Sequence, residues 1–95
     1  MPAYIHASVE VTDPVLYETY RAQVPAVIAA FGGRYLVRGG AVTALEGAAP
    51  AQRQVIIEFP DMARLLAFYN SPQYQTLLAI RLKAGRSNLV AIEGV

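Results

Sequence analysis

The chain contains segments of two hydrophobic periods, one typical of strands and one typical of helices. Residues 3–11 read AYIHASVEV, in which apolar and polar positions alternate as in a half-buried strand. Short β-prone runs at 55–59 (VIIEF) and 87–95 (SNLVAIEGV) predict two more strands. RYLV at 34–37 begins a further strand, which we expect to continue through GGAVTALEG to a hairpin loop at 49–53.

The helical segments begin at recognisable caps. Asp13 followed by Pro14 is a good helix start, and apolar residues then recur at helical spacing as far as Phe31. Pro25 is expected to kink this helix, because proline removes a backbone donor and crowds the preceding turn. Gly32 is placed to end it in the left-handed conformation.

A second helical region follows the strand at 55–59. Asp61 is its predicted N-cap, and Ser71 before Pro72 repeats the same signal, so the region is expected to continue as QYQTLLAIRLKAG and to end at Gly85. Ser71, Asp13 and Asp61 are therefore interpreted as caps rather than as catalytic groups. Gly39 and Gly40, within the second predicted strand, are interpreted as a bulge or bend.

The order strand, helix, strand, strand, helix, strand predicts an α+β, ferredoxin-like βαββαβ domain over residues 1–95, with a four-stranded antiparallel sheet. Helices cover one face of such a sheet, here predicted to carry Ile5, Val9, Val55, Ile57 and Phe59. The other face would then carry Tyr4, His6, Ser8, Glu10, Leu36, Arg38, Ile56 and Glu58. Because this second face mixes charged and large apolar groups, we expect a homodimer that packs two sheets together.

Composition narrows the classes of function. With a net charge of +1 and 16% charged residues there is no electrostatic case for nucleic acid or an anionic membrane, and no run approaches the length of a membrane helix. The chain lacks cysteine, so a disulfide framework and a thiol nucleophile are excluded. These features predict a soluble, cytoplasmic protein, and no metal or other cofactor is expected.

Several motifs occur together in a specific order: TDPxxYxxY at 12–20, FGGRYLVRGG at 31–40, LEG at 45–47, IIEFPD at 56–61 and FYNSPQYQ at 68–75. With them nearly the whole chain resembles the DUF1330 family of uncharacterised domains. The resemblance implies a dimeric α+β barrel, in which two ferredoxin-like protomers place their sheets face to face. Relatives of that fold include cofactor-free monooxygenases, isomerases and stress-responsive proteins, but the family itself implies no agreed reaction.

Three groups of residues are candidates for binding or chemistry. His6 can act as a general base near neutral pH, or can be a hydrogen-bonded histidine of a dimer interface. Arg34 and Arg38 are four residues apart on a strand, so they are expected on the same side, where they can clamp an anion, with Glu58 as a further ligand-binding candidate, or pair with Glu58, Glu46 or Glu10 across the sheet or dimer. Finally, the helical tyrosines Tyr20, Tyr69 and Tyr74 can line a ligand pocket or fill the core.

These candidates leave the function open. The chain is predicted to bind a small anionic or aromatic metabolite. One alternative is a cofactor-independent monooxygenase- or isomerase-like enzyme, in which His6, Arg34 and a tyrosine position the substrate. Another is a non-catalytic, stress-responsive dimer.

Overall fold

A computed structural model describes all residues 1–95 and contains four strands and three helices. In chain order these elements are β1 (Ala3–Val11), α1 (Pro14–Ala30), β2 (Arg34–Arg38), β3 (Arg53–Phe59), α2 (Met62–Tyr69), α3 (Pro72–Ala84) and β4 (Gly85–Glu93). The strands form one antiparallel sheet in the order β2-β3-β1-β4. This is the predicted ferredoxin-like arrangement, with the second helical region divided into α2 and α3.

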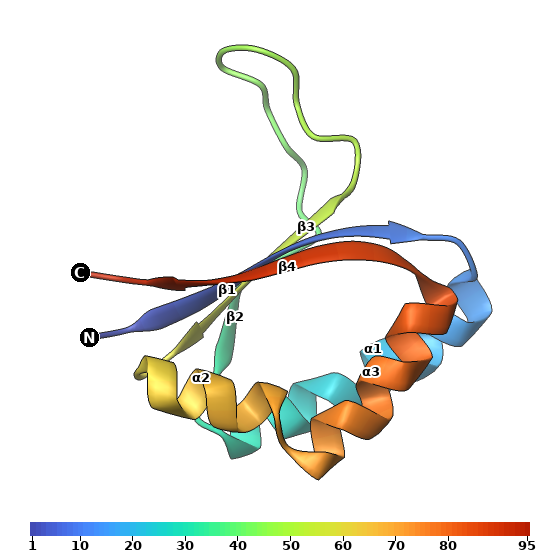
Figure 1. Ribbon diagram of the computed structural model, residues 1–95. Helices are drawn as coiled ribbons and strands as arrows, with labels where there is room; N and C mark the ends of the chain where they lie inside the picture. The colour runs from blue at the N-terminus through green and yellow to red at the C-terminus, as the bar shows by residue number, and fades with distance from the viewer.

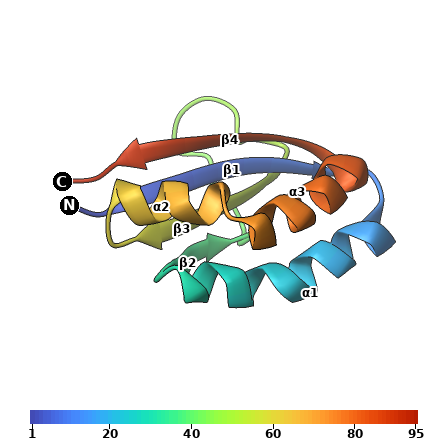
Figure 2. The ribbon, with the colours of Figure 1, turned by 60° about the horizontal axis from the view of Figure 1, so that its bottom comes forward.

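All three helices lie on one face of the sheet, so the molecule has two layers (Figures 1 and 2). Alternation along β1 decides which face each side chain occupies: Ala3, Ile5, Ala7 and Val9 are buried, and the residues between them are only partly buried. The same alternation buries Val55, Ile57 and Phe59 of β3 beneath the helices. The predicted covered face is therefore confirmed.

The helix caps are as predicted. The Asp13 side chain accepts a hydrogen bond from the Leu16 backbone N–H, Asp61 accepts one from Arg64, and the Ser71 hydroxyl accepts one from Tyr74. Gly32 takes the left-handed conformation after α1, with φ +81°. Helix α1 runs through Pro25 as one element, because its apolar stripe of Tyr20, Val24 and Ile28 stays buried on both sides of the proline.

The predicted continuation of the second strand is wrong. Strand β2 ends at Arg38, and residues 39–52 form a loop that contains neither helix nor strand. Gly39 has φ +69°, a conformation that leaves the extended region and ends the pairing with β3. The hairpin loop is therefore longer than the expected 49–53, and Arg53 belongs to β3.

The bulge in β2 lies at Leu36 instead of at the two glycines. Tyr35 pairs with Ile57 but Val37 pairs with Ile56, so two residues of β2 face one of β3 at this point. The extra residue reverses the alternation beyond it. Arg34 consequently lies on the face away from the helices, whereas Arg38 lies on the helix-covered face, and the expectation that the two arginines share a side is wrong.

We call the face away from the helices the open face. Cross-strand pairing places Ile92 beside Tyr4, and Val90 and Ile56 beside His6, on this face. Leu36, Val90 and Ile92 are each about half exposed there. A large apolar surface is thus left uncovered in the single chain.

Candidate functional site

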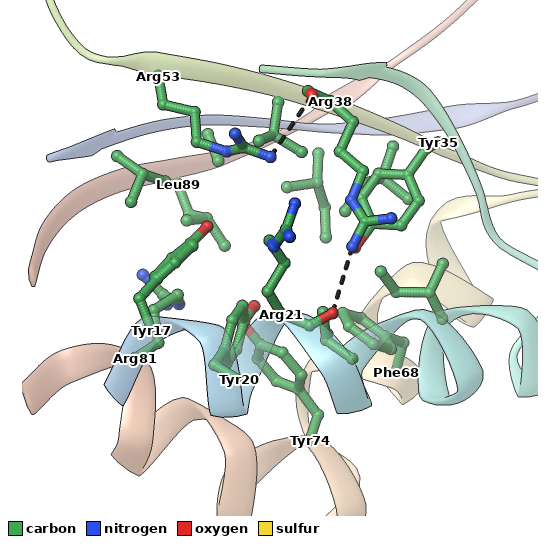
Figure 3. A pocket seen from close by; sticks show the side chains of 17 residues that line it. Tyr17, Tyr20, Arg21, Tyr35, Arg38, Arg53, Phe68, Tyr74, Arg81 and Leu89 are labelled. Carbon is green, nitrogen blue, oxygen red and sulfur yellow. Dashed lines mark hydrogen bonds between the residues drawn. The ribbon is translucent and has the colours of Figure 1, made fainter. Parts of the chain in front are cut away.

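A pocket opens between α1 and the helix-covered face of the sheet (Figure 3). Its inner end is aromatic. Tyr20 from α1 and Tyr74 from α3 are buried, and their hydroxyls are 3.1 Å apart in a hydrogen bond. The ring of Phe68 packs on Tyr74 with the ring centroids 4.5 Å apart. Because these rings come from three different helices, the pocket exists only in the folded chain.

Four arginines from four elements line the same pocket, and we call it the arginine pocket: Arg21 (α1), Arg38 (β2), Arg53 (β3) and Arg81 (α3). Figure 3 shows the side chains of Arg21, Arg38 and Arg53 directed into the space between α1 and the sheet. The guanidinium of Arg38 also lies over the Tyr35 ring, 4.6 Å from its centroid. This cation–π contact holds one side of the pocket entrance.

The polar contacts of these arginines are mostly to uncharged oxygens. Arg38 donates to the backbone carbonyl of Arg21 at 3.2 Å, and Arg53 donates to that of Arg38 at 3.4 Å. Arg81, which is only 5% exposed, donates to the Ser87 hydroxyl. The Nε atoms of Arg53 and Arg81 are buried without a hydrogen-bond partner. Buried donors of this kind usually have a partner, so these two indicate a group that is completed by a ligand.

Of the four pocket arginines, only Arg21 has a carboxylate partner. The chain has two ion pairs, Arg21–Glu18 at 2.9 Å and Arg34–Glu58 at 2.8 Å, and the second lies outside the pocket. Arg38, Arg53 and Arg81 therefore have no carboxylate partner. The lining contains no Asp, Glu or His. An apolar pocket with several unneutralised guanidiniums favours an anion.

Burial raises the pKa of two tyrosines of the pocket, Tyr20 and Tyr35. Burial raises the pKa of the Tyr20 phenol far above its ordinary value, and the neighbouring Tyr74 raises it further. Burial also raises the pKa of Tyr35, against the opposing effect of Arg38. At neutral pH these hydroxyls can donate hydrogen bonds to an anion but cannot act as bases.

The free space in the pocket is small, about 40 Å³, which holds about three water molecules. Arg21 and Arg38 are exposed residues at its entrance, and their long side chains can turn outward. A larger ligand would enter by displacing them, with its apolar part against Tyr20 and Tyr74.

Among the predicted site residues, Tyr20, Arg38 and Tyr74 come together in this pocket. Tyr69 does not join them. It lines a second, wholly apolar groove between α2 and β4, although its ring lies 5.5 Å from that of Tyr74.

The remaining predicted residues lie on the open face. Arg34 and Glu58 form an ion pair there. His6 donates from Nε2 to the side-chain oxygen of Gln54 at 2.8 Å. His6 also lines a shallow, mostly apolar depression with Tyr4 and Ile92. No group of three or more His, Cys, Asp or Glu side chains is arranged to hold a metal ion.

Sequence reasoning missed two of the central arginines, although each had a signal. Arg53 lies two residues before Val55 on β3, so strand alternation places it on the helix-covered face. Arg81 lies four residues after Leu77 and three before Ala84, on the buried stripe of α3. An arginine at an inward-facing position loses hydration, so it indicates a site that an anionic partner would stabilise.

Fold and site together define a ferredoxin-like α+β domain with a cationic, aromatic pocket between its layers. The chain belongs to the family described as Domain of unknown function (DUF1330), whose model matches residues 2–95. No match was found among curated proteins. None of the helices combines the length and hydrophobicity needed to cross a membrane.

Similar solved structures share the fold at low sequence identity. A protein of unknown function from Rhodopseudomonas palustris, RPA0582, matches with a TM-score of 0.74 and 20% identity, over 99% of this chain and 82% of that one. A protein from Jannaschia sp. CCS1, described as dimeric and ferredoxin-like, matches with a TM-score of 0.68 and 15% identity, over 99% and 100%. A candidate antibiotic biosynthesis monooxygenase from Caulobacter crescentus matches with a TM-score of 0.62 and 14% identity, over 99% and 90%.

Proposed function

We propose that this chain binds a small organic anion in the arginine pocket. The observation that carries the proposal is that Arg38, Arg53 and Arg81 line one pocket and have no carboxylate partner. Of these three arginines only Arg81 is buried; a buried guanidinium without a counter-ion is costly, and an anionic ligand would offset that cost. The anionic group would lie near Arg53, with an apolar or aromatic body against the tyrosines.

The lining supports binding better than acid–base catalysis. Burial raises the pKa of Tyr20 and Tyr35, and the lining has no carboxylate or imidazole to exchange a proton near neutral pH. His6 lies on the opposite face of the sheet and is hydrogen-bonded to Gln54. An enzyme in which His6 and an arginine act on one substrate is therefore not favoured by this arrangement.

Calorimetric titration with benzoate, and separately with its neutral isostere benzamide, tests the proposal. We expect benzoate to bind and benzamide to bind at least about tenfold more weakly, because a charge-assisted hydrogen bond is lost. Inorganic phosphate serves as an anion without an apolar body. Equal binding of benzoate and benzamide, or no binding of either anion at millimolar concentration, would contradict the proposal.

The variants Arg53→Met and Arg34→Met form a matched pair for this titration. Both remove an arginine of the same sheet, but only Arg53 lines the pocket. Arg53→Met should weaken benzoate binding about tenfold or more, whereas Arg34→Met should leave it unchanged. The same loss in both variants would indicate a nonspecific effect of net charge.

We also propose that the protein is a homodimer formed through the open face. The support is the apolar surface around Leu36, Val90 and Ile92, which a second sheet would cover. Ile56→Lys would place a charge in this interface, so light scattering should then report the mass of a monomer. Leu82→Lys, at an exposed leucine on α3, is the control that should leave the mass unchanged. A dimer that persists in Ile56→Lys would refute this interface.

A further inference from the structure

The loop of residues 39–52, which we call the arm, stands away from the rest of the chain. It leaves the sheet on the side of the open face, opposite the helices (Figure 1). Every residue of the arm is exposed. Its two hydrogen bonds are at its base: the Gly39 backbone N–H donates to the Gln54 carbonyl at 2.8 Å, and the Gln54 side chain donates to the Gln52 carbonyl at 3.1 Å.

The arm is apolar for a segment with this exposure. Leu45 is 92% exposed and Val42 is 47% exposed, and Glu46 is the one charged residue between Gly39 and Gln52. Loops of this length without secondary structure are uncommon in compact domains, and those that occur are usually functional or disordered. Nothing in the single chain packs against Leu45, so its burial requires a second molecule.

We infer that the arm packs on a second copy of this chain, with Leu45 in the apolar groove between α2 and β4 of the partner subunit. This inference rests on the proposed homodimer. The arm begins near the open face, two residues after Val37, which with Leu36 is an exposed apolar residue of that face. In a twofold dimer each subunit contributes the same arm, so both arms are accommodated by one kind of contact.

The arm is long enough for this contact. Two packed sheets lie about 10 Å apart. Half of the arm, about six or seven residues at roughly 3.3 Å each, spans about 20 Å when extended. The tip of the arm would therefore pass beyond the partner's sheet and reach the level of its helices.

The two edges of the partner's sheet differ in polarity, and this difference indicates where Leu45 binds. The cationic arginine pocket reaches the β2 edge through Tyr35 and Arg38. At the β4 edge, the groove between α2 and β4 is lined by hydrophobic residues alone and has a volume of about 190 Å³. Leu66, half exposed, and Val90 belong to this groove. A leucine side chain fits an apolar groove of this size, and its burial removes apolar surface from water on both sides.

The test is the dimer dissociation constant, measured by analytical ultracentrifugation for Leu45→Asp, Leu66→Asp and the double variant. Each single variant should raise the constant about a hundredfold, because the twofold dimer loses two leucine contacts, each worth about tenfold. The double variant should raise it no more than the stronger single variant, because both changes break the same contact. Leu82→Asp is the matched control and should leave the constant unchanged. Leu66→Ala repeats the measurement if Leu66→Asp does not fold.

The outcomes test the contact made by the arm and the existence of the dimer separately. An unchanged constant in Leu45→Asp overturns the role of the arm, even if Ile56→Lys dissociates the dimer as proposed above. Fully independent effects of Leu45→Asp and Leu66→Asp overturn the groove as the binding position of the arm. A wild-type protein that is monomeric at all concentrations overturns both the dimer and the arm.

Discussion

The two faces of the sheet differ in whether their charged side chains have polar partners. On the helix-covered face, Arg53 and Arg81 have buried Nε atoms without partners, and neither arginine forms an ion pair. On the open face, Arg34 is paired with Glu58 and His6 with Gln54. The covered face thus carries unsatisfied charge inside an apolar setting, and the open face carries satisfied polar groups beside uncovered apolar ones.

This difference shows which face needs which kind of partner. A guanidinium without a counter-ion is completed by an anion, because only charge offsets the loss of hydration. An apolar surface is completed by another apolar surface, which need not be charged. We therefore expect a small ligand on the covered face and a protein subunit on the open face.

The largest expected effect is a difference in stability loss between two neighbouring isoleucines of β3, Ile56 and Ile57. Ile57 is buried under the helices, so Ile57→Ala should lower the free energy of unfolding by about 2–5 kcal/mol at every protein concentration. Ile56 lies on the open face, so the loss in Ile56→Ala should depend on concentration if it acts through the proposed dimer. Chemical denaturation at two protein concentrations measures both. A loss in Ile56→Ala that is independent of concentration would break the distinction between the faces.

A smaller effect is expected at Arg81. Arg81→Met removes a buried cation that lacks a carboxylate and keeps a similar volume, so the ligand-free protein should gain about 1–2 kcal/mol in stability. The same variant should lose the stabilisation that benzoate gives to the wild type. Arg64→Met, at an exposed position on α2, should change stability by less than about 0.5 kcal/mol. A clear loss of stability in Arg81→Met would mean that its contact with Ser87 outweighs the cost of burial.

The smallest effect concerns the pH dependence of stability. The unfolded chain releases tyrosine protons near the ordinary pKa of about 10, whereas the raised pKa of Tyr20 keeps its proton bound in the folded state. Stability is therefore fully present below pH 10 and falls as the pH rises above it, by about 1 kcal/mol near pH 11. Tyr20→Phe should flatten this fall, measured as the difference in unfolding free energy between pH 8 and pH 11. An equally steep fall in the variant would contradict a raised pKa at Tyr20.

Local signals in the sequence were sufficient for most of the fold. Alternation in β1 and the caps at Asp13, Asp61 and Ser71 each depend on a few neighbouring residues, and all were predicted correctly. The bulge at Leu36 was not, because it is a property of the pairing between β2 and β3. The end of β2 at Arg38 was missed for the same reason. The β-prone letters of residues 41–45 form a strand only where a neighbouring strand pairs with them.

The candidate site was only partly accessible from the sequence. Tyr20, Tyr74 and Arg38 were named, but Arg38 was expected on the wrong face beside Arg34. One inserted residue in β2 reverses the side on which every later residue lies. Arg53 and Arg81 were overlooked although their positions on β3 and α3 mark them as inward-facing.

The sequence by itself determined the order of the elements, the helix caps and the covered face of β1 and β3, because periodicity and capping act over a few residues along the chain. Only the tertiary structure decided that four arginines from four elements meet in one pocket and that Arg34 and His6 are excluded from it. It also decided that the arm stands clear of the open face. Which charges meet, and which lack partners, depends on contacts between residues that are distant in the sequence, and these are fixed only when the sheet and helices pack.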